Sequence, residues 1–225
     1  MVINNYKYSN KILKKYIYIW IFKKVKHNYK LTNSEIDYLK NMSELRSEEF
    51  RISRSCIRKA LAQLFEIKPL EVPLLAPPGL PPKLENNMGY INLSHCKDAL
   101  LIGWSIANIG VDIEQSNRKI KFKNSLKRIF HEKELKDIEY SSNYFSQNLI
   151  KRWVVKESLL KWQNNFQWSD CKNWYWHLGD KSARNENLDL EVKIYQRKFL
   201  NWEFSIAGQL IKEDLNIICF DNYII

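Results

Sequence analysis

The chain has 225 residues, 45% of them hydrophobic and 27% charged, so it is long enough to bury a sizeable core and too apolar for an intrinsically disordered protein. Its 36 Lys and Arg against 25 Asp and Glu give a formal charge of +11. This excess favours an anionic partner, such as nucleic acid, a membrane surface, an acidic protein or a phosphate-rich small molecule, although a merely soluble basic face is an alternative.

The cysteines and the N-terminal apolar run bear on where the protein works. The four cysteines are widely spaced and form no CxxC pair, which argues against a zinc ribbon and for reduced, mostly buried thiols. The apolar run at Ile17–Phe22 is too short to cross a bilayer, and no cleavage-site pattern follows it. We therefore expect a cytoplasmic protein with no membrane partner.

Helices and strands are predicted in mixed order, which indicates an α+β fold. A buried strand at Tyr16–Phe22 is followed by a helix that Thr32 or Ser34 can cap. All six prolines fall within residues 69–82, which predicts an extended loop. The remaining predicted helices are Ser47–Phe65, Lys123–Ile129, Glu132–Tyr140 and Asn148–Gln163, and the remaining strands are Tyr90–Leu93, Ala99–Ile106, Ile109–Glu114, Asp189–Tyr195, Trp202–Ala207 and Leu215–Phe220. Each half has helices followed by strands, with a junction near Ile106–Gly110.

The first candidate site motif is NIGVDIE at Asn108–Glu114. In a strand, Asp112 and Glu114 point to one side together with Gly110, about 7 Å apart, and can share one hard cation. The alternative is an acidic solvent-facing side of an edge strand. The spacing alone leaves both interpretations open.

The second motif is RWVVKESLLKW at Arg152–Trp162. Trp153, Glu157 and Lys161 recur every four residues and share one helix face. A surface Glu–Lys pair is the simpler interpretation. The alternative makes Glu157 a third carboxylate for a cation and Lys161 a positive charge for phosphate, since Mg²⁺ usually completes its shell with substrate phosphates.

A third element, Asn92-Leu93-Ser94-His95, lies at the end of a predicted strand. His95 alone would suit a structural role. In combination, however, NLSH, GVDIE, FHEKEL and WVVKESLLK follow one another in an order and at separations that resemble the 4′-phosphopantetheinyl transferases of the surfactin-synthetase-activating type. The resemblance extends over about residues 15 to 207 and includes the arginine-bearing helices of the first half.

The resemblance implies two similar α+β lobes in one monomeric chain, residues 1–107 and 108–225, with the active site in the cleft between them. It implies transfer of the 4′-phosphopantetheine arm of coenzyme A to a serine of an apo carrier protein with an acidic surface, with release of adenosine 3′,5′-bisphosphate. Which carrier protein is used, and in which pathway, is left open.

The resemblance also implies roles for individual residues. The metal ligands would be Asp112, Glu114 and Glu157, holding Mg²⁺ or Mn²⁺. Glu134 would deprotonate the attacking serine, and Lys161 would stabilise the charge that develops on the pyrophosphate. Coenzyme A would be bound by Arg46, Arg58, Ser94, His95 and Lys161.

The sequence departs from the family pattern in two places. Pro78–Pro81 stands where many members have Gly-Lys-Pro, so one lysine contact to coenzyme A is missing, and Trp162–Phe166 replaces a glycine-containing turn. Two other classes remain as alternatives: a Mg²⁺-dependent nuclease or other nucleic-acid-acting protein, favoured by the basic charge, and a non-catalytic carrier-binding relative. The helical placement of Glu157 and Lys161 argues against the nuclease, and the presence of all three carboxylates argues against the non-catalytic relative.

Overall fold

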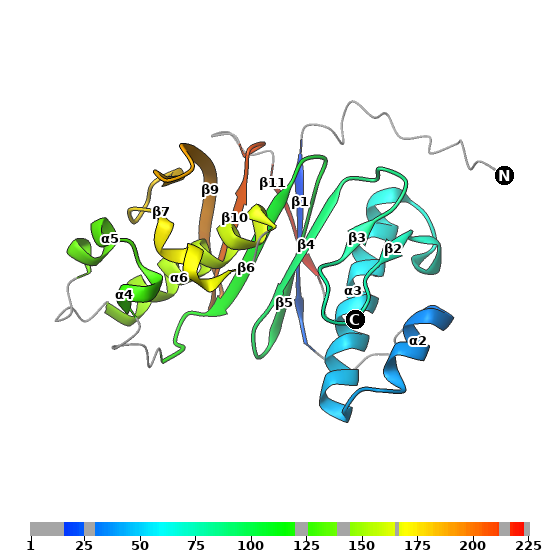
Figure 1. Ribbon diagram of the computed structural model, residues 1–225. Coiled ribbons are helices and arrows are strands. Elements are labelled where there is room, and N and C mark those ends of the chain that lie inside the picture. The colour runs from blue at the N-terminus through cyan, green and yellow to red at the C-terminus, as the bar shows by residue number, and fades with distance from the viewer. Residues whose placement is uncertain are drawn as a thin grey trace.

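The computed structural model combines helices with mainly antiparallel sheets, which confirms the predicted α+β class (Figure 1). It describes residues 16–24, 30–119, 126–138, 145–164, 167–211 and 217–222.

The first sheet has four strands in the order β11-β1-β5-β4. Its strand β1 pairs antiparallel with β5 and parallel with β11, so the last strand of the chain joins the sheet that the first strand begins. The strands are β1 (Ile17–Lys23), β4 (Tyr90–His95), β5 (Ala99–Ser105) and β11 (Ile217–Asn222).

The second sheet has five strands in the order β6-β10-β9-β8-β7, all antiparallel. They are β6 (Ile109–Gln115), β7 (Trp174–Tyr175), β8 (Ser182–Asn185), β9 (Leu190–Phe199) and β10 (Trp202–Gly208). A small hairpin of β2 (Leu74–Leu75) and β3 (Lys83–Leu84) lies within and just after the proline-rich segment.

The helices are α2 (Asn33–Leu39), α3 (Glu44–Phe65), α4 (Leu126–Ile129), α5 (Glu132–Asp137) and α6 (Phe145–Gln163), with short 3-10 turns η1 (Pro69–Glu71) and η2 (Trp168–Asn173). The two long helices cover opposite sides of the molecule. Helix α3 packs on the first sheet through residues such as Ile57 and Leu61, and α6 packs on the second through residues such as Val155 and Leu159.

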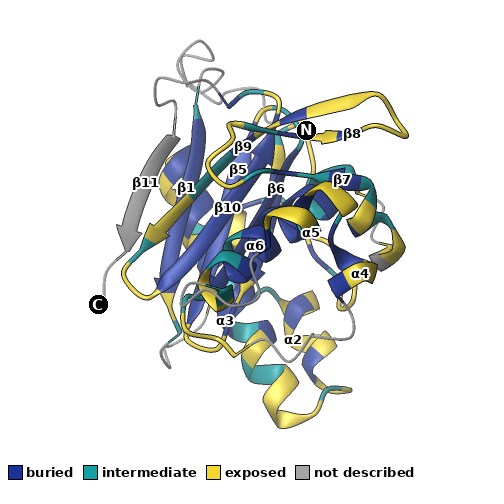
Figure 2. Cartoon of the chain, turned by 90° about the vertical axis from the view of Figure 1, so that its left-hand side faces the viewer, coloured by how far each residue is buried: buried dark blue, intermediate teal, exposed yellow. Residues whose placement is uncertain are grey.

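The two sheets pack against each other between these helices, as Figure 1 shows. Ile19 and Leu101 of the first sheet share a buried cluster with Val111, Phe204 and Ile206 of the second. Figure 2 shows the central strands as an almost continuously buried layer, with exposed residues on the outer helices and the β8–β9 turn. The result is a layered order of helix, sheet, sheet and helix.

The same connection occurs twice along the chain. A strand, β1 or β6, leads to a long helix, α3 or α6, and then to an antiparallel hairpin, β4–β5 or β9–β10. In each sheet the leading strand pairs with the second strand of the hairpin, giving β1-β5-β4 and β6-β10-β9. The two halves of the chain therefore share their local topology.

Most predicted elements are present, with shifted ends. Helix α3 begins at Glu44, three residues before the predicted start, and α6 begins at Phe145. Thr32 is the N-cap of α2, with a capping box to Glu35. Parts of the predicted helices at 123–129 and 132–140 lie outside the described residues. Sequence patterns missed β2, β3, β7 and β8, which are too short for a recognisable alternation.

Three of the cysteines lie in the packed interior. Cys56, Cys96 and Cys171 are free and buried, as predicted, whereas the side chain of Cys219 lies outside the described residues.

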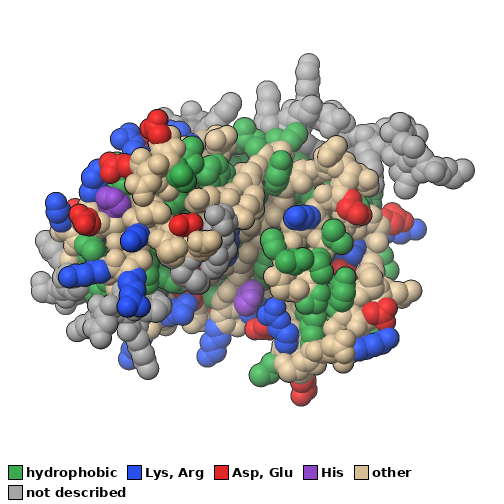
Figure 3. All heavy atoms as spheres, in the orientation of Figure 1, with side chains coloured by type: hydrophobic (Ala, Val, Ile, Leu, Met, Phe, Trp, Pro, Cys, Tyr) green, Lys and Arg blue, Asp and Glu red, His purple; other side chains and the backbone are tan. Residues whose placement is uncertain are grey.

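No helix in the described part of the chain is long and apolar enough to cross a membrane. On the face in Figure 3, hydrophobic side chains gather where the segment from Pro69 to Leu84 covers α3, and exposed Leu75 and Leu80 belong to that segment.

Candidate active site

The sequence-predicted carboxylates lie where α6 packs on β6, and Gly110 permits the close approach. A Cβ atom at Gly110 would lie 1.9 Å from the Ser158 carbonyl oxygen and 2.4 Å from the Trp162 amide nitrogen, both backbone atoms of α6. Only glycine leaves room for this contact. It brings the last turns of α6 directly over the alternate residues of β6 that face away from the sheet core.

Lys161 joins the helix to the strand at this point. Its Nζ donates to Asp112 Oδ1 at 2.8 Å and to the Val111 carbonyl oxygen at 3.1 Å. The lysine side chain is 20% exposed, whereas that of Asp112 is 8% exposed. An ammonium group therefore lies beside a nearly buried carboxylate at the edge of the accessible surface.

Glu157 lies close enough to this pair to respond to it. Burial, followed by the negative charge of Asp112, raises the pKa of Glu157 to about 7, while Lys161 and Arg118 act in the opposite direction. Glu157 and Asp112 thus repel each other in a poorly solvated place, since burial disfavours the charged form of a carboxyl group. A cation between the two carboxylates would relieve that repulsion.

Glu114 is oriented differently from the other two predicted metal ligands. Its Oε2 accepts from Arg118 Nη1, and its Oε1 accepts from the Gln115 amide. Across the described residues, no three His, Cys, Asp or Glu side chains are gathered in a way that could hold a metal ion. The donor set fits a cation held by Asp112 and Glu157 together with phosphate oxygens, which is a common arrangement for Mg²⁺. Three carboxylates on one ion would require Glu114 to leave Arg118.

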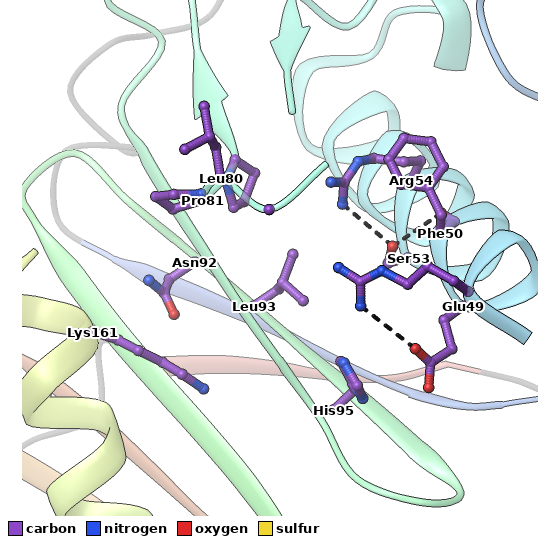
Figure 4. Close-up of a pocket in the computed structure, with 13 residues that line it drawn as sticks. Glu49, Phe50, Ser53, Arg54, Leu80, Pro81, Asn92, Leu93, His95 and Lys161 are labelled. Atoms are coloured by element: carbon purple, nitrogen blue, oxygen red, sulfur yellow. Dashed lines mark hydrogen bonds and ion pairs between the residues drawn. The ribbon is translucent and has the colours of Figure 1, made fainter. Parts of the chain in front are cut away.

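A pocket of about 310 Å³ opens beside Lys161, between α3, β4 and the proline-rich segment (Figure 4). Its lining includes the cationic side chains of Arg46, Arg54 and Lys161 and the imidazole of His95. In Figure 4, Lys161 enters from the side opposite Arg54. The pocket suits an anionic ligand, because its charged lining is mostly basic, with Glu49 as the acidic member.

Arg54 is a pocket residue that the sequence placed in a basic stripe of this helix but not among the predicted coenzyme A ligands. Its Nε donates to the Ala76 carbonyl oxygen at 3.0 Å, Nη1 contacts Ser53 Oγ at 3.3 Å, and its guanidinium carbon lies 4.4 Å from the centre of the Phe50 ring. Burial lowers its pKa to about 10, which still leaves it charged at neutral pH. Its spacing of eight residues from Arg46 on one helix was a usable signal.

His95 has an unpredicted neighbour in Lys24, whose Nζ lies 3.2 Å from His95 Nδ1. Desolvation, followed by the charge of Lys24, lowers the pKa of His95. The imidazole is therefore neutral at pH 7, and with an ammonium facing Nδ1 the proton is on Nε2. The two residues are 71 positions apart, so no local pattern could have paired them.

Arg58, for which the resemblance implied a contact to coenzyme A, is not among the residues that line this pocket. Its guanidinium is 3% exposed and pairs with Glu35 through both Nε and Nη2, while Nη1 donates to the Pro69 and Val72 carbonyl oxygens. These donors are already used in holding α2 and η1 to α3. Arg54 lies on the same face of α3 but one turn earlier, and this shift along the helix axis brings it to the pocket.

Glu134 is likewise placed in the interior. Its carboxylate is 0% exposed, lies 2.5 Å from Lys156 Nζ, and accepts from the backbone amides of His131 and Trp176. A carboxylate so enclosed is not positioned to take a proton from a serine of another protein. In this structure Glu134 holds α5 to α6, and the expected role as general base stays a prediction.

Ser94 is turned away from the pocket. Its Oγ donates to Asp112 Oδ1 at 2.6 Å, across the contact between β4 and β6, and the residue is 6% exposed. Two residues earlier, Asn92 Oδ1 accepts from the Val111 amide at 3.3 Å. Of the NLSH motif, Asn92, Leu93 and His95 line the pocket, whereas Ser94 contacts the carboxylate of Asp112.

The two departures from the family pattern also lie at this site. Gly79, Leu80 and Pro81 line the pocket, and Leu80 contributes an apolar side chain there. After Lys161, Asn164 adopts a left-handed conformation with φ of 56°, which glycine commonly fills. Asn164 Nδ2 donates to Asn108 Oδ1 at 3.3 Å, and both residues line a neighbouring cavity of about 640 Å³.

The comparison with known families bears on the second half of the chain. Residues 108–217 match the model of the 4′-phosphopantetheinyl transferase superfamily. The match covers β6, α6 and β10, the elements that carry Asp112, Glu157 and Lys161, and it supports a transferase and phosphopantetheine transfer in general. No curated protein matches the chain.

Proposed function

We propose that the protein transfers the 4′-phosphopantetheine arm of coenzyme A to a serine of an apo carrier protein. The observation that carries the proposal is the grouping of Asp112 and Glu157 with Lys161, which lines a basic pocket, within the segment that matches the transferase superfamily. The carrier protein would present an acidic surface, which the net charge of +11 would attract. Coenzyme A is polyanionic and would benefit from the same charge.

The two strand–helix–hairpin units would form the two lobes, divided near residue 107, with coenzyme A between them. Arg46, Arg54 and His95 would bind its nucleotide phosphates from the first unit. Lys161 would then meet the pyrophosphate from the second unit. This proposal replaces Arg58 with Arg54 as a nucleotide-binding residue.

In the reaction, the serine oxygen forms a bond to the phosphorus that carries pantetheine, and the bond to the bridging oxygen of the pyrophosphate breaks. The products are the phosphopantetheinyl serine and adenosine 3′,5′-bisphosphate, and the serine proton is released. Asp112 and Glu157 would hold Mg²⁺, which supplies charge neutralisation on the pyrophosphate when bound. Lys161 would stabilise the negative charge that gathers on the leaving phosphate.

The test is intact-mass spectrometry of apo carrier proteins of the fatty-acid and peptide type, incubated with the protein, coenzyme A and Mg²⁺. We expect a gain of one phosphopantetheine that EDTA abolishes. Retention of coenzyme A with no mass gain on any carrier would leave a non-catalytic relative as the better description. Failure to bind coenzyme A as well would overturn the proposal.

A further inference from the structure

Ser94 and Asp112 form a side-chain hydrogen bond that connects the two halves of the chain. Ser94 lies on β4 of the first sheet and Asp112 on β6 of the second, and their side chains meet at 2.6 Å. A carboxylate can only accept, so the serine hydroxyl is the donor. Hydrogen bonds of this length to an ionised oxygen belong to the strong class.

The same carboxylate oxygen receives a second donor. Lys161 Nζ lies 2.8 Å from Asp112 Oδ1, the atom that Ser94 contacts. None of the hydrogen bonds found among the described side chains runs to Oδ2. Two donors on one oxygen fix the rotation of the carboxylate and leave its other oxygen as the one available to a cation.

The two donors differ in how firmly they are held. Ser94 is 6% exposed and lies where β4, the last strand of its sheet, contacts β6, whereas the Lys161 side chain is 20% exposed and ends a long flexible stem. If Lys161 is drawn to a bound pyrophosphate, Asp112 loses one of its two donors. Ser94 is then the donor that still sets the orientation of the carboxylate.

We infer that Ser94 is a positioning residue, which orients Asp112 so that Oδ2 and Glu157 can share a divalent cation. The inference rests on the proposed function for the identity of the cation site. It replaces the expectation that Ser94 binds the nucleotide of coenzyme A. Groups that orient a metal ligand in this way typically change metal affinity or activity 10- to 100-fold when removed.

The chain offers a matched control in Ser205. This residue lies directly opposite Asp112 on the neighbouring strand β10, is fully buried, and shares a hydrogen bond with Ser158 Oγ at 3.0 Å. Ser205→Ala therefore deletes a buried hydroxyl beside Asp112 without touching its carboxylate. Ser94→Thr keeps a hydroxyl at position 94 and serves as the conservative rescue.

The first measurement is the affinity for Mn²⁺ alone, with binding monitored by electron paramagnetic resonance. We expect Ser94→Ala to bind Mn²⁺ about 10- to 100-fold more weakly than the wild type, with Ser94→Thr close to the wild type and Ser205→Ala unchanged. Equal Mn²⁺ affinity in Ser94→Ala and the wild type overturns the inference. An absence of Mn²⁺ binding in the wild type overturns it as well.

The second measurement is the affinity for adenosine 3′,5′-bisphosphate in EDTA, which separates positioning from nucleotide binding. Ser94→Ala should bind this nucleotide as the wild type does, and in turnover it should lower kcat while leaving KM for coenzyme A unchanged. Weaker nucleotide binding without metal would show that Ser94 contacts the ligand, and would overturn the inference. If the wild type binds Mn²⁺ but transfers nothing, the proposed function fails while the Mn²⁺ series still decides the role of Ser94.

Discussion

The two long helices are anchored by buried ion pairs of the same construction. In the first half, Glu35 at the third position of α2 closes a capping box and pairs with Arg58 of α3. In the second half, Glu134 at the third position of α5 does the same with Lys156 of α6. Both cations also donate to carbonyl oxygens of the segment that follows their helix.

The halves differ in the charged residues next to these anchors. On α3, Arg54 lies one turn before Arg58 and faces the basic pocket. On α6, Glu157 follows Lys156 directly and faces Asp112, with Lys161 one turn later. The comparison shows that the most deeply buried charges serve the scaffold in both halves. The charges at the edge of the helix contact, Arg54 and Lys161, are the ones that line the pocket.

The largest expected effect concerns the carboxylates of the second half. Glu157→Gln should lower transfer at least ~1,000-fold, because the cation site loses one of two charged ligands, while the protein stays folded. The measurement is the rate of carrier modification by mass spectrometry, with thermal unfolding alongside. The exposed Glu191→Gln is the control, and near-normal activity in Glu157→Gln would remove the metal assignment.

Substitutions in the two buried ion pairs, Glu35–Arg58 and Glu134–Lys156, should lower the stability of the protein and not its rate of transfer. Arg58→Met and Lys156→Met should each cost roughly 3–5 kcal/mol of the free energy of unfolding in urea, because each leaves a buried carboxylate unpaired. Adding Glu134→Gln to Lys156→Met should recover much of the loss. If Glu134→Gln alone keeps its stability but loses turnover, Glu134 is the general base after all, and the two anchors are not equivalent.

The burial of Glu157, together with the nearby charge of Asp112, predicts a pH effect in metal-free protein. Its folded pKa of about 7 lies above the usual value of 4.5, so between these pH values the folded state binds more protons than the unfolded state. The contribution of Glu157 to the free energy of unfolding is therefore largest below pH 4.5. It is lost as the pH rises through about 7, by up to about 3 kcal/mol. Urea unfolding of the wild type and Glu157→Gln at pH 5 and pH 7.5 should show a difference that Mg²⁺ reduces. Parallel pH profiles in the two proteins would contradict this.

The smallest expected effect belongs to the first half. Arg54→Gln should raise KM for coenzyme A about 10- to 100-fold with little change in kcat, because a charged contact to phosphate is lost. Arg51→Gln, on the same helix but outside the pocket lining, is the matched control. A larger effect of Arg51→Gln than of Arg54→Gln would place the nucleotide elsewhere.

The motif at β6 shows how far local sequence patterns reach. Alternation correctly placed Ile109, Val111 and Ile113 towards the core and Asp112 on the opposite side. It could not show that Glu114 pairs with Arg118, or that Gly110 is required by the backbone of α6. The Gly110 contact depends on another segment, α6, whereas the Glu114–Arg118 pair depends on how the chain turns directly after β6.

The sequence by itself determined the α+β class, the main strands and helices, and the residue types that make a phosphate-transfer site plausible. Strand alternation and the helical period are local properties, so they survive without knowledge of the rest of the fold. Only the tertiary structure decided that Arg54 and not Arg58 faces the pocket, that Glu134 is enclosed by Lys156, and that Ser94 holds Asp112. The physical reason is that a side chain's role depends on which distant segment packs against it, and residues one helical turn apart can meet entirely different partners.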